Sequence, residues 1–322
     1  MKKRRGSKMR YNTYSEYLKN KYGERVYKIP VNLNLTCPNR NGCLGTGGCI
    51  FCGEEGAAFE NLSPDMPVKE QIEKNIEYIG TKYKAKKYII YFQNYSNTYM
   101  PLERFKSMIS DAVHSDVCGV YISTRPDCID ERYLEFLKDF SEETGYDICI
   151  ELGLQTVNYK TLQIINRQHT LAEFIDAVLM IHKYGFEICA HIILNLPWDT
   201  IDDVIECAKI VSALRVEQVK LHSLYIPYGT SIATMYENND FDMGTYDSYI
   251  EKVITFLKYL SSDVVIQRII GRAKESMTAF SNYGTSWWKI KDEIDDIMEK
   301  KDIRQGELCD YLGGKALKKS KF

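Results

Sequence analysis

The 322-residue sequence lacks the features that mark membrane, secreted and repetitive proteins. No apolar run approaches the roughly 18 residues that a membrane-spanning helix needs, and the mean hydropathy is −0.33. The basic N-terminus has none of the apolar stretch that characterises a secretory signal. No low-complexity tract or short repeat interrupts the chain. These absences predict a cytoplasmic protein that has no membrane among its partners.

Disulfide bonds are also not expected, although the chain has ten cysteines, because the cytoplasm keeps thiols reduced. Four of the cysteines lie within sixteen residues, at Cys37, Cys43, Cys49 and Cys52. The other six are scattered, and we interpret them as core thiols that act as small apolar side chains. No second cysteine-rich motif occurs, so a second metal cluster is not expected.

The net charge of −2 is unevenly distributed along the chain. Residues 1–40 carry eleven Lys or Arg residues against two acidic residues, and residues 315–322 add four lysines. The stretch between these basic ends is therefore acidic. Basic ends on an acidic body are typical of proteins that bind a polyanion, and also of an ordinary enzyme with solvated tails.

From about Val26 onward, apolar strand-like segments alternate with segments of helical periodicity. Strands nearly continuous in Ile, Val, Leu and Tyr are typical of a parallel sheet covered on both faces, and right-handed crossovers wind such a sheet into a barrel or part of one. The predicted strands are 26–35, 86–92, 117–123, 147–154, 187–194 and 216–226. The predicted helices are 67–83, 102–115, 130–145, 158–184 and 199–214.

The fold class predicted from this pattern is α/β, a partial (β/α)6 barrel of the TIM type. Residues 1–25 are expected to form a basic N-terminal segment, and residues 26–230 the partial barrel. Residues 231–322 are expected to form a C-terminal α/β extension packed on the barrel, with a helix at 245–260 and a strand at 264–270.

The cysteine cluster lies in the loop after the first predicted strand, at the mouth where barrel enzymes place their chemistry. Four glycines within residues 42–48 allow the chain to fold tightly there. Soft thiolates select zinc or an iron–sulfur cluster. Structural zinc usually takes two short-spaced pairs of ligands, and only Cys49 and Cys52 form such a pair. The residues alone favour an iron–sulfur cluster but leave zinc and free thiols as alternatives.

The sequence resembles the radical S-adenosylmethionine (SAM) superfamily, and within it the YtqA/YhcC group, which is distantly related to the elongator acetyltransferase subunit. The resemblance covers about residues 11–300. It rests on the ordered blocks RYNTYSEYLKNKYGERVYKIP, TCPNRNG, GTGGCIFC, YFQNYSNTY, STRPDCI, IELGLQTVN, INRQHT, HIILNLP and HSLYIPYGT.

The resemblance implies a [4Fe-4S] cluster held by Cys37, Cys49 and Cys52, with S-adenosylmethionine bound at the fourth iron. Cys43 lies at a position that the group does not need as cysteine, and its role stays open. One-electron reduction by a donor of the flavodoxin or ferredoxin type then cleaves SAM into methionine and a 5′-deoxyadenosyl radical, which takes a hydrogen atom from the substrate. No Ser-His-Asp constellation is needed to generate the radical.

Candidate contacts to SAM follow the predicted strands. In the superfamily an aromatic residue at the position of Phe51 packs near the adenine, and the resemblance assigns SAM contacts to Gln155 and Arg167. Burying Glu151 in an apolar strand is costly without a partner, which favours a ligand or network role. Arg125 offers a bidentate partner for a carboxylate. The remaining candidates at strand ends are Asn94, Tyr95, Ser96, Ser123 and His191.

The resemblance further implies a substrate, because members of the group are linked to modification of the tRNA wobble uridine at C5. The basic N-terminal segment and its tyrosines would suit RNA, with cations for phosphates and rings for splayed bases. Those tyrosines are Tyr11, Tyr14, Tyr17, Tyr22 and Tyr27. The same rings could instead pack against the first strand. Two other functions stay open: a radical SAM enzyme acting on a small metabolite or porphyrin-like substrate, and a non-catalytic zinc-bearing RNA-binding module.

Overall fold

The computed structural model describes residues 9–53, 62–272 and 275–320. Seven parallel strands form one sheet in the order β1-β2-β3-β4-β5-β6-β8, and β7 and β9 form a small antiparallel pair. The strands are β1 (Val26–Val31), β2 (Lys87–Phe92), β3 (Val117–Thr124), β4 (Asp147–Gln155), β5 (Glu187–Ile193), β6 (Gln218–His222), β7 (Ile226–Pro227), β8 (Val265–Arg268) and β9 (Thr278–Phe280).

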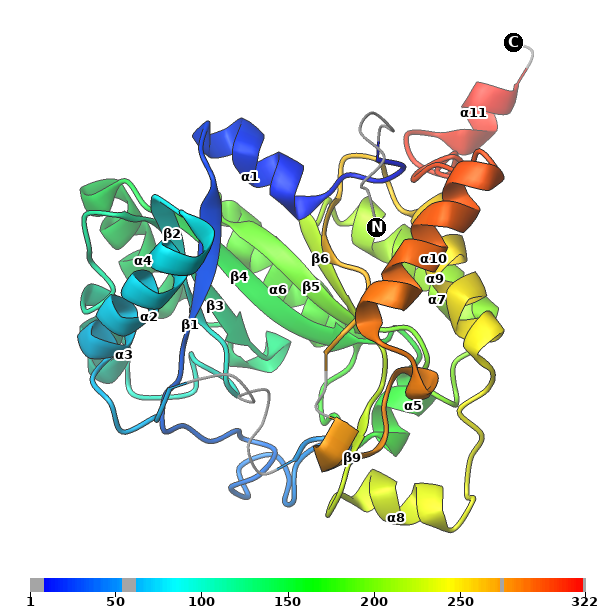
Figure 1. Cartoon of the computed structure of the whole chain (residues 1–322), viewed down its shortest axis with the longest axis horizontal. Coiled ribbons are helices and arrows are strands. Elements are labelled where there is room, and N and C mark those ends of the chain that lie inside the picture. The colour runs from blue at the N-terminus through cyan, green and yellow to red at the C-terminus, as the bar shows by residue number, and fades with distance from the viewer. Residues whose placement is uncertain (1–8, 54–61, 273–274, 321–322) are drawn as a thin grey trace.

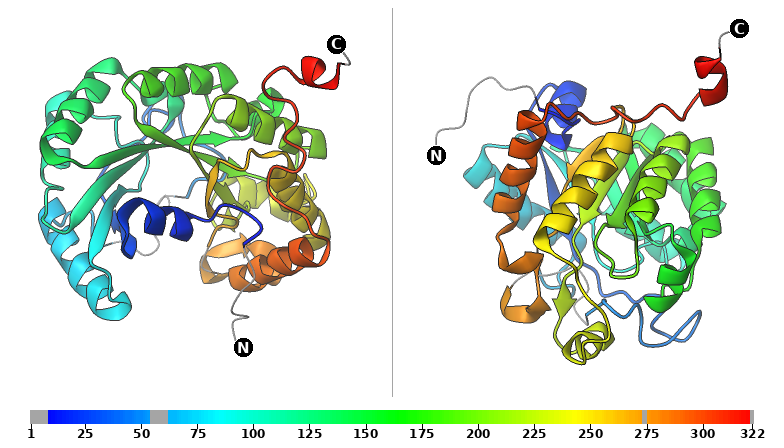
Figure 2. Two further views of the ribbon diagram at one scale, coloured as in Figure 1. Left: turned by 90° about the horizontal axis from the view of Figure 1, so that it is seen from above. Right: turned by 90° about the vertical axis from the view of Figure 1, so that its right-hand side faces the viewer.

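Helices between the strands cover the convex side of the sheet, and the sheet curls into an open half-barrel (Figure 2, left). The helices are α1 (Tyr14–Tyr22), α2 (Val68–Tyr83), α3 (Leu102–Ser110), α4 (Glu131–Thr144), α5 (Tyr159–Ile164), α6 (Leu171–Lys183), α7 (Ile201–Ala213), α8 (Ser231–Glu237), α9 (Tyr246–Tyr259), α10 (Trp287–Lys300) and α11 (Lys315–Lys319). The predicted α/β partial barrel is confirmed.

The two faces of the sheet differ in chemistry because successive side chains of a strand point to opposite sides. On β4, Ile150 and Leu152 belong to the large apolar core beneath the helices. Cys149 lies in a separate cluster inside the barrel, next to α1, and Glu151, also on the inner side, is fully buried. The helices are therefore held by an apolar outer face, while the inner face carries polar groups that can serve a site.

The C-terminal extension contributes to the same sheet. Its strand β8 pairs in parallel with β6, with Gln218 opposite Val265 and Lys220 opposite Arg268. Helices α9 and α10 of the extension pack against each other, and α9 packs on α7 (Figure 1). The extension therefore adds a seventh strand to the six that the sequence predicts for the barrel.

The N-terminal segment crosses the open side of the half-barrel at the end where the strands begin (Figures 1 and 2). A parallel bridge joins Thr13 to Ile266 of β8, and α1 packs against both β1 and β8. Leu18 of α1 is 5% exposed and contacts the apolar layer inside the barrel. This helix therefore closes the end of the barrel that lies opposite the cysteine loop.

The N-terminal tyrosines pack against the protein, which is the alternative to an RNA-facing surface that the sequence left open. Tyr17 donates a hydrogen bond to Glu187, and Tyr22 donates one of 2.5 Å to Asp147. The ring of Tyr14 stacks on that of Tyr17. The remaining two have comparable partners: Tyr11 bonds to Asp295, and Tyr27 stacks on Tyr83. These hydrogen bonds and ring contacts therefore attach the N-terminal segment to the barrel.

No helix within residues 9–53, 62–272 and 275–320 is long and apolar enough to cross a bilayer.

We predict that Leu18→Ala will lower the free energy of unfolding by about 2–5 kcal/mol, because it removes a buried side chain of α1, the helix that closes this end of the barrel. The neighbouring Lys19 is exposed, and Lys19→Ala should change stability by less than about 0.5 kcal/mol. Urea unfolding followed by circular dichroism measures both values. Equal stability of the two variants would show that α1 does not plug the barrel.

Candidate functional site

The cysteine loop directly follows β1 and lies at the end of the barrel where the strands finish (Figure 1). Its turns are closed by backbone hydrogen bonds, including Gly48 N to Asn39 O at 2.8 Å and Cys52 N to Cys49 O at 2.9 Å. Gly48 has a φ of +81°, a conformation that side chains resist. A Cβ at Gly45 would lie 2.3 Å from Asn39 Oδ1. These glycines let the loop fold back on itself around the sulfur atoms.

Donor groups point at the sulfur atoms of the loop. Asn39 Nδ2 lies 3.6 Å and Arg167 Nη1 3.5 Å from Cys49 Sγ, and Ser96 Oγ lies 3.9 Å from Cys37 Sγ. Hydrogen-bond donors around sulfur stabilise the thiolate form that metals bind, and they tune the cluster that it holds. The donor set therefore fits thiolates in an iron–sulfur centre.

Cys52 differs from Cys49 in its surroundings. Burial raises the pKa of the Cys52 thiol, the negative charge of Cys49 raises it further, and Arg40 opposes both effects. Arg40 also donates to the carbonyl oxygens of Cys52 and Gly53, at 2.6 and 2.7 Å. Arg40 thus brings a positive charge to a group of sulfur ligands that would be anionic with metal bound.

The spacing of the sulfur atoms bears on the choice between zinc and a cluster. A zinc ion with Zn–S bonds of about 2.3 Å brings its thiolates to roughly 4 Å from one another. Among the described residues, the only three potential ligand atoms within 4.8 Å of one another belong to Glu151, Cys189 and His191. No three sulfur atoms of the described loop therefore lie as close together as the thiolates of a zinc site do. Cys43, which a four-thiol zinc site would need, is exposed.

Arg167 connects the loop to β4. Its Nη1 faces Cys49, its Nη2 donates to Gly153 O at 2.9 Å, and its Nε donates to His169 at 2.7 Å. A Cβ on Gly153 would lie 2.5 Å from Arg167 Nη2 and 2.9 Å from Gln155 Nε2. The glycine therefore leaves room for both predicted SAM contacts. Gln155 itself has a φ of +71°, at a register shift near the end of β4.

Arg125 is held by its own neighbours. It forms a bidentate ion pair with Asp127 through bonds of 2.8 and 2.6 Å, and it donates to Arg167 O at 2.9 Å. Its Nη1 is buried and has no partner among the described residues. The bidentate carboxylate partner of Arg125 in this structure is therefore Asp127, and one donor remains for a ligand.

The corner after β2 is polar and buried. Asn94 donates to Asn32, while its own Oδ1 is buried without a partner in the described part of the chain. Tyr95 has a φ of +53°, and its ring lies 5.4 Å from the guanidinium of Arg40. Ser96 contacts Cys37, as described above. The predicted residues of this corner therefore adjoin the cysteine loop.

Phe51 and Ser123 occupy different surroundings. Phe51 packs at the edge of an apolar cluster that includes Ile165 and Ile226, next to the cysteines. Ser123, at the end of β3, is 2.8 Å from the hydroxyl of Tyr91. Phe51 thus lies where an aromatic ring can meet a ligand of the loop, whereas Ser123 joins the polar interior of the barrel.

Glu151 is the centre of that interior, and both of its oxygens already have partners. Oε1 accepts from Lys28 and from Gln267 at 3.1 Å, and Oε2 accepts from Lys220 at 2.6 Å and His191 at 2.7 Å. The carboxylate is fully buried. The structure therefore gives Glu151 and His191 partners within the protein, which matches the network role weighed for Glu151.

The charges of the network determine its protonation. Burial alone would raise the pKa of Glu151, but Lys220, Lys28 and the hydrogen bond from His191 outweigh it and hold that pKa well below its usual range. Burial and the charge of Lys220 lower the pKa of His191 to about 4. At neutral pH the carboxylate is ionised and His191 is neutral. The ammonium groups on the same carboxylate oppose a metal cation at Glu151, Cys189 and His191.

Sequence reasoning missed the cations of this network, Lys28 and Lys220, and also Arg268 above it. Each lies in a strand that also contains buried apolar residues. The principle that singled out Glu151 applies equally to them, because a charge in a buried strand needs a partner. The inward register of Lys28 and Lys220 could therefore have been read from the strands, but their shared partner could not.

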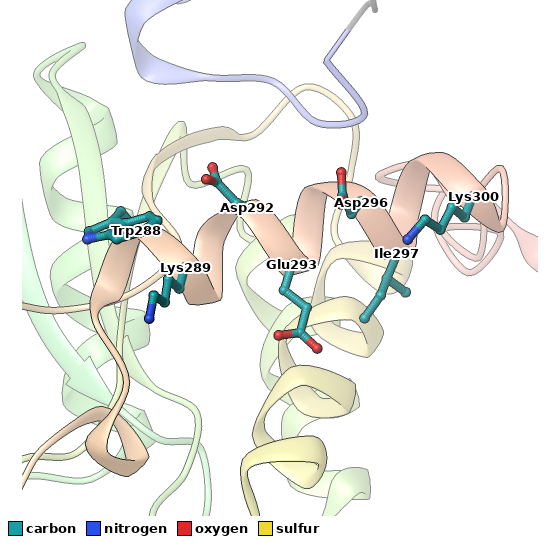
Figure 3. A pocket seen from close by; sticks show the side chains of 7 residues that line it. All are labelled: Trp288, Lys289, Asp292, Glu293, Asp296, Ile297 and Lys300. Carbon is teal, nitrogen blue, oxygen red and sulfur yellow. The ribbon is translucent and has the colours of Figure 1, made fainter. Parts of the chain in front are cut away.

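A separate hollow lies on the surface of α10 (Figure 3). It is lined by Trp288, Lys289, Asp292, Glu293, Asp296, Ile297 and Lys300. None of the predicted site residues contributes to it. It is therefore distinct from the site at the cysteine loop.

We predict that Glu151→Gln will destabilise the protein by about 3–5 kcal/mol, because it leaves two buried ammonium groups without their carboxylate. Glu135 is exposed, and Glu135→Gln should alter stability by less than about 0.5 kcal/mol. Urea unfolding at pH 7.5 compares the variants. A loss below 1 kcal/mol for Glu151→Gln would contradict the network.

We also predict that acid destabilises the protein through His191. The unfolded histidine binds its proton near pH 6.5 and the folded one near pH 4, so stability is complete above pH 6.5 and falls as the pH drops toward 4. This residue contributes up to about 3 kcal/mol to the fall. Urea unfolding between pH 7.5 and 4.5 should give a shallower pH dependence for His191→Gln. Parallel curves for the two proteins would count against this role.

Known proteins share both the sequence and the domain pattern of this chain. Residues 40–211 match the radical SAM superfamily, and residues 216–300 match the radical SAM C-terminal domain. Protein MJ0486 of Methanocaldococcus jannaschii is 36% identical over 91% of this chain and 90% of its own length. YtqA of Bacillus subtilis is 31% identical over 94% of each chain. YhcC of Escherichia coli is 28% identical over 92% of this chain and 95% of its own.

Solved structures with the same fold are much less similar in sequence. Archaeal Elp3 of Methanocaldococcus infernus superposes with a TM-score of 0.63 and 16% identity, over 87% of this chain and 64% of that longer chain. Methylornithine synthase (PylB) gives a TM-score of 0.51 and 13% identity, over 91% and 87% of the two chains. By sequence match and by fold, this chain belongs to the radical SAM superfamily, whose enzymes use a [4Fe-4S] cluster and S-adenosylmethionine.

Proposed function

We propose that Cys37, Cys49 and Cys52 hold the [4Fe-4S] cluster, and that the enzyme modifies the C5 side chain of the tRNA wobble uridine. The observation that carries the ligand assignment is the set of donors aimed at sulfur, from Asn39 and Arg167 to Cys49 and from Ser96 to Cys37. When bound, the cluster and SAM together supply a radical that abstracts hydrogen from the substrate.

The protein's own residues would position SAM at the same edge of the sheet. The unpartnered Nη1 of Arg125 and Oδ1 of Asn94 are a donor and an acceptor buried beside the cysteine loop. They suit the carboxylate and the amino group of an amino acid, which carry complementary hydrogen-bonding groups. Gln155 is at the end of β4, next to Arg167, and Phe51 is part of the cysteine loop. We propose these four residues as contacts to SAM, together with Arg167.

The substrate proposal rests on similarity to elongator proteins and on an exposed tyrosine beside the cysteine loop. Archaeal Elp3 shares the fold, and zebrafish elongator complex protein 3 is 26% identical over 44% of this chain. Tyr228 is 60% exposed and follows Pro227, whose ring lies 3.7 Å from the position of a Cβ on Gly53. An exposed ring beside the cysteine loop can stack on an unpaired base. RNA would therefore approach at the mouth rather than at the N-terminal segment.

We expect an external one-electron donor, a flavodoxin or a ferredoxin, to reduce the cluster. A tRNA-modifying enzyme of this type would act in the cytoplasm. The alternative of a small-molecule substrate predicts activity that does not depend on RNA. Assays with and without tRNA therefore separate the tRNA substrate from a small-molecule substrate.

We predict that anaerobically reconstituted protein with dithionite and SAM will form 5′-deoxyadenosine. Undermodified tRNA should increase the amount of 5′-deoxyadenosine and should itself acquire a changed nucleoside. Cys49→Ala should abolish SAM cleavage and the iron content should fall, since one ligand is lost. Cys43→Ala should keep both, because Cys43 is exposed. Mass spectrometry of nucleosides and an iron and sulfide assay provide the measurements.

The RNA part of the proposal has its own matched variants. Tyr228→Ala should raise the tRNA concentration needed for half-maximal activity by about tenfold, and Tyr228→Phe should keep the wild-type value, because stacking needs the ring only. Cleavage of SAM that tRNA leaves unchanged, with no altered nucleoside, would exclude the tRNA substrate. Activity that survives in Cys49→Ala would exclude the ligand assignment.

A further inference from the structure

Arg268 lies at the end of β8, in the polar interior of the barrel and beside the Glu151 network. Its Nη2 donates to the ring of His222 at 2.7 Å, and its Nε is buried without a partner among the described residues. Burial lowers the pKa of this arginine, and the hydroxyls of Tyr91 and Tyr225 and the carboxylate of Glu151 oppose the shift. A buried donor without an acceptor is costly, so this group is suited to receive a ligand atom.

The charges around Arg268 are not balanced by the protein. Three cations, Lys28, Lys220 and Arg268, surround the single carboxylate of Glu151. His222 adds no charge, because burial and then Arg268 lower its pKa far below the usual range, and His191 is also neutral at pH 7. Lys28 and Lys220 both bond to Glu151, whereas Arg268 forms no ion pair with a carboxylate of the described residues. The excess positive charge is therefore located at Arg268.

The position of Arg268 also separates it from the residues proposed above to contact SAM. Those residues come from the cysteine loop, from the ends of β2, β3 and β4 and from the turn after α5, while Arg268 and His222 come from β8 and β6 at the other side of the sheet. Of the earlier candidates, only Glu151 and His191 lie near Arg268, and they bond to each other. The ring of His222 lies 5.3 Å from that of His191, above the Glu151 network. A substrate group that enters the barrel beside SAM would meet this side.

We propose that Arg268 binds a carboxylate carried by the substrate, with the neutral ring of His222 fixing the guanidinium in place. The inference deepens the proposed function, because it assigns the substrate an anionic side chain at the reacting end. The guanidinium offers Nε–H as a charge-assisted donor to such a group. A terminal carboxylate is attached to its substrate at one side only, whereas a backbone phosphate of RNA is attached to the polymer on both sides and is less able to reach a group inside the barrel.

The test uses the cluster-containing protein with SAM bound, under anoxic conditions and without tRNA. Its melting temperature is measured with increasing sodium acetate, acetamide or inorganic phosphate at constant ionic strength. Acetate should raise the melting temperature in a saturable way, because a ligand that binds only the folded state stabilises it. Acetamide has nearly the same shape without the charge, and it should have no effect.

Variants locate the acetate effect. Arg268→Gln should weaken the apparent acetate affinity by about tenfold or more, in line with the loss of a charged hydrogen bond. Arg268→Lys should keep part of it, because the charge remains. Arg215 is exposed, and Arg215→Gln should leave the affinity unchanged. If Arg268→Gln does not fold, the comparison of acetate with acetamide in the wild type and in Arg268→Lys decides the question.

Three results would overturn the inference: equal shifts with acetate and acetamide, a shift with phosphate but none with acetate, or an acetate affinity that Arg268→Gln leaves unchanged. Because tRNA is absent, this outcome is independent of the substrate proposal. Acetate binding at Arg268 with no modification of tRNA would keep the carboxylate site and exclude the wobble uridine.

Discussion

The ionic contact of Glu151 with Lys28 and Lys220 is the constraint on which the interior of this barrel depends. A carboxylate that is fully buried is tolerated only with charged and hydrogen-bonded partners. Glu151 and its two cationic partners lie on three different strands, so the network links β1, β4 and β6 across the open half-barrel. An apolar interior would pack without such constraints, but it would offer no polar surface to a cofactor or substrate at the mouth.

The two ends of the barrel use their polar groups differently. At the end where strands begin, Glu187 and Asp147 accept hydrogen bonds from Tyr17 and Tyr22 of α1, and the segment closes the barrel. At the other end, Arg125, Asn94 and Arg268 each keep a buried polar atom without a partner among the described residues. A stable protein satisfies nearly all such atoms. The plugged end also has such an atom, the hydroxyl of Tyr14, but the group near the cysteine loop and the barrel mouth is larger and supports our proposal that ligands bind at that end.

Features that depend on residues close together in sequence could be predicted, whereas contacts between distant residues could not. The strands and helices of the partial barrel could be predicted, because apolar periodicity is a local property that β4 and α4 show within their own residues. The cysteine loop could be recognised from its spacing and glycines. The role of the N-terminal tyrosines stayed open between RNA contact and packing, because composition does not tell whether a ring faces solvent or the barrel end. Arg268 was missed because its neighbour His222 is far away in sequence.

The same physical reasoning explains why the functional end cannot be made more stable without cost to binding. Pairing the free donor of Arg268 with an introduced acid would remove an unsatisfied group, and it would also place a negative charge where a substrate carboxylate has to bind. Filling the space above Gly153 would displace Arg167 from Cys49, since a Cβ there meets Nη2 at 2.5 Å. The site therefore requires the unpartnered polar atoms and Gly153. The apolar face beneath the helices and the end closed by α1 supply the stability of the protein.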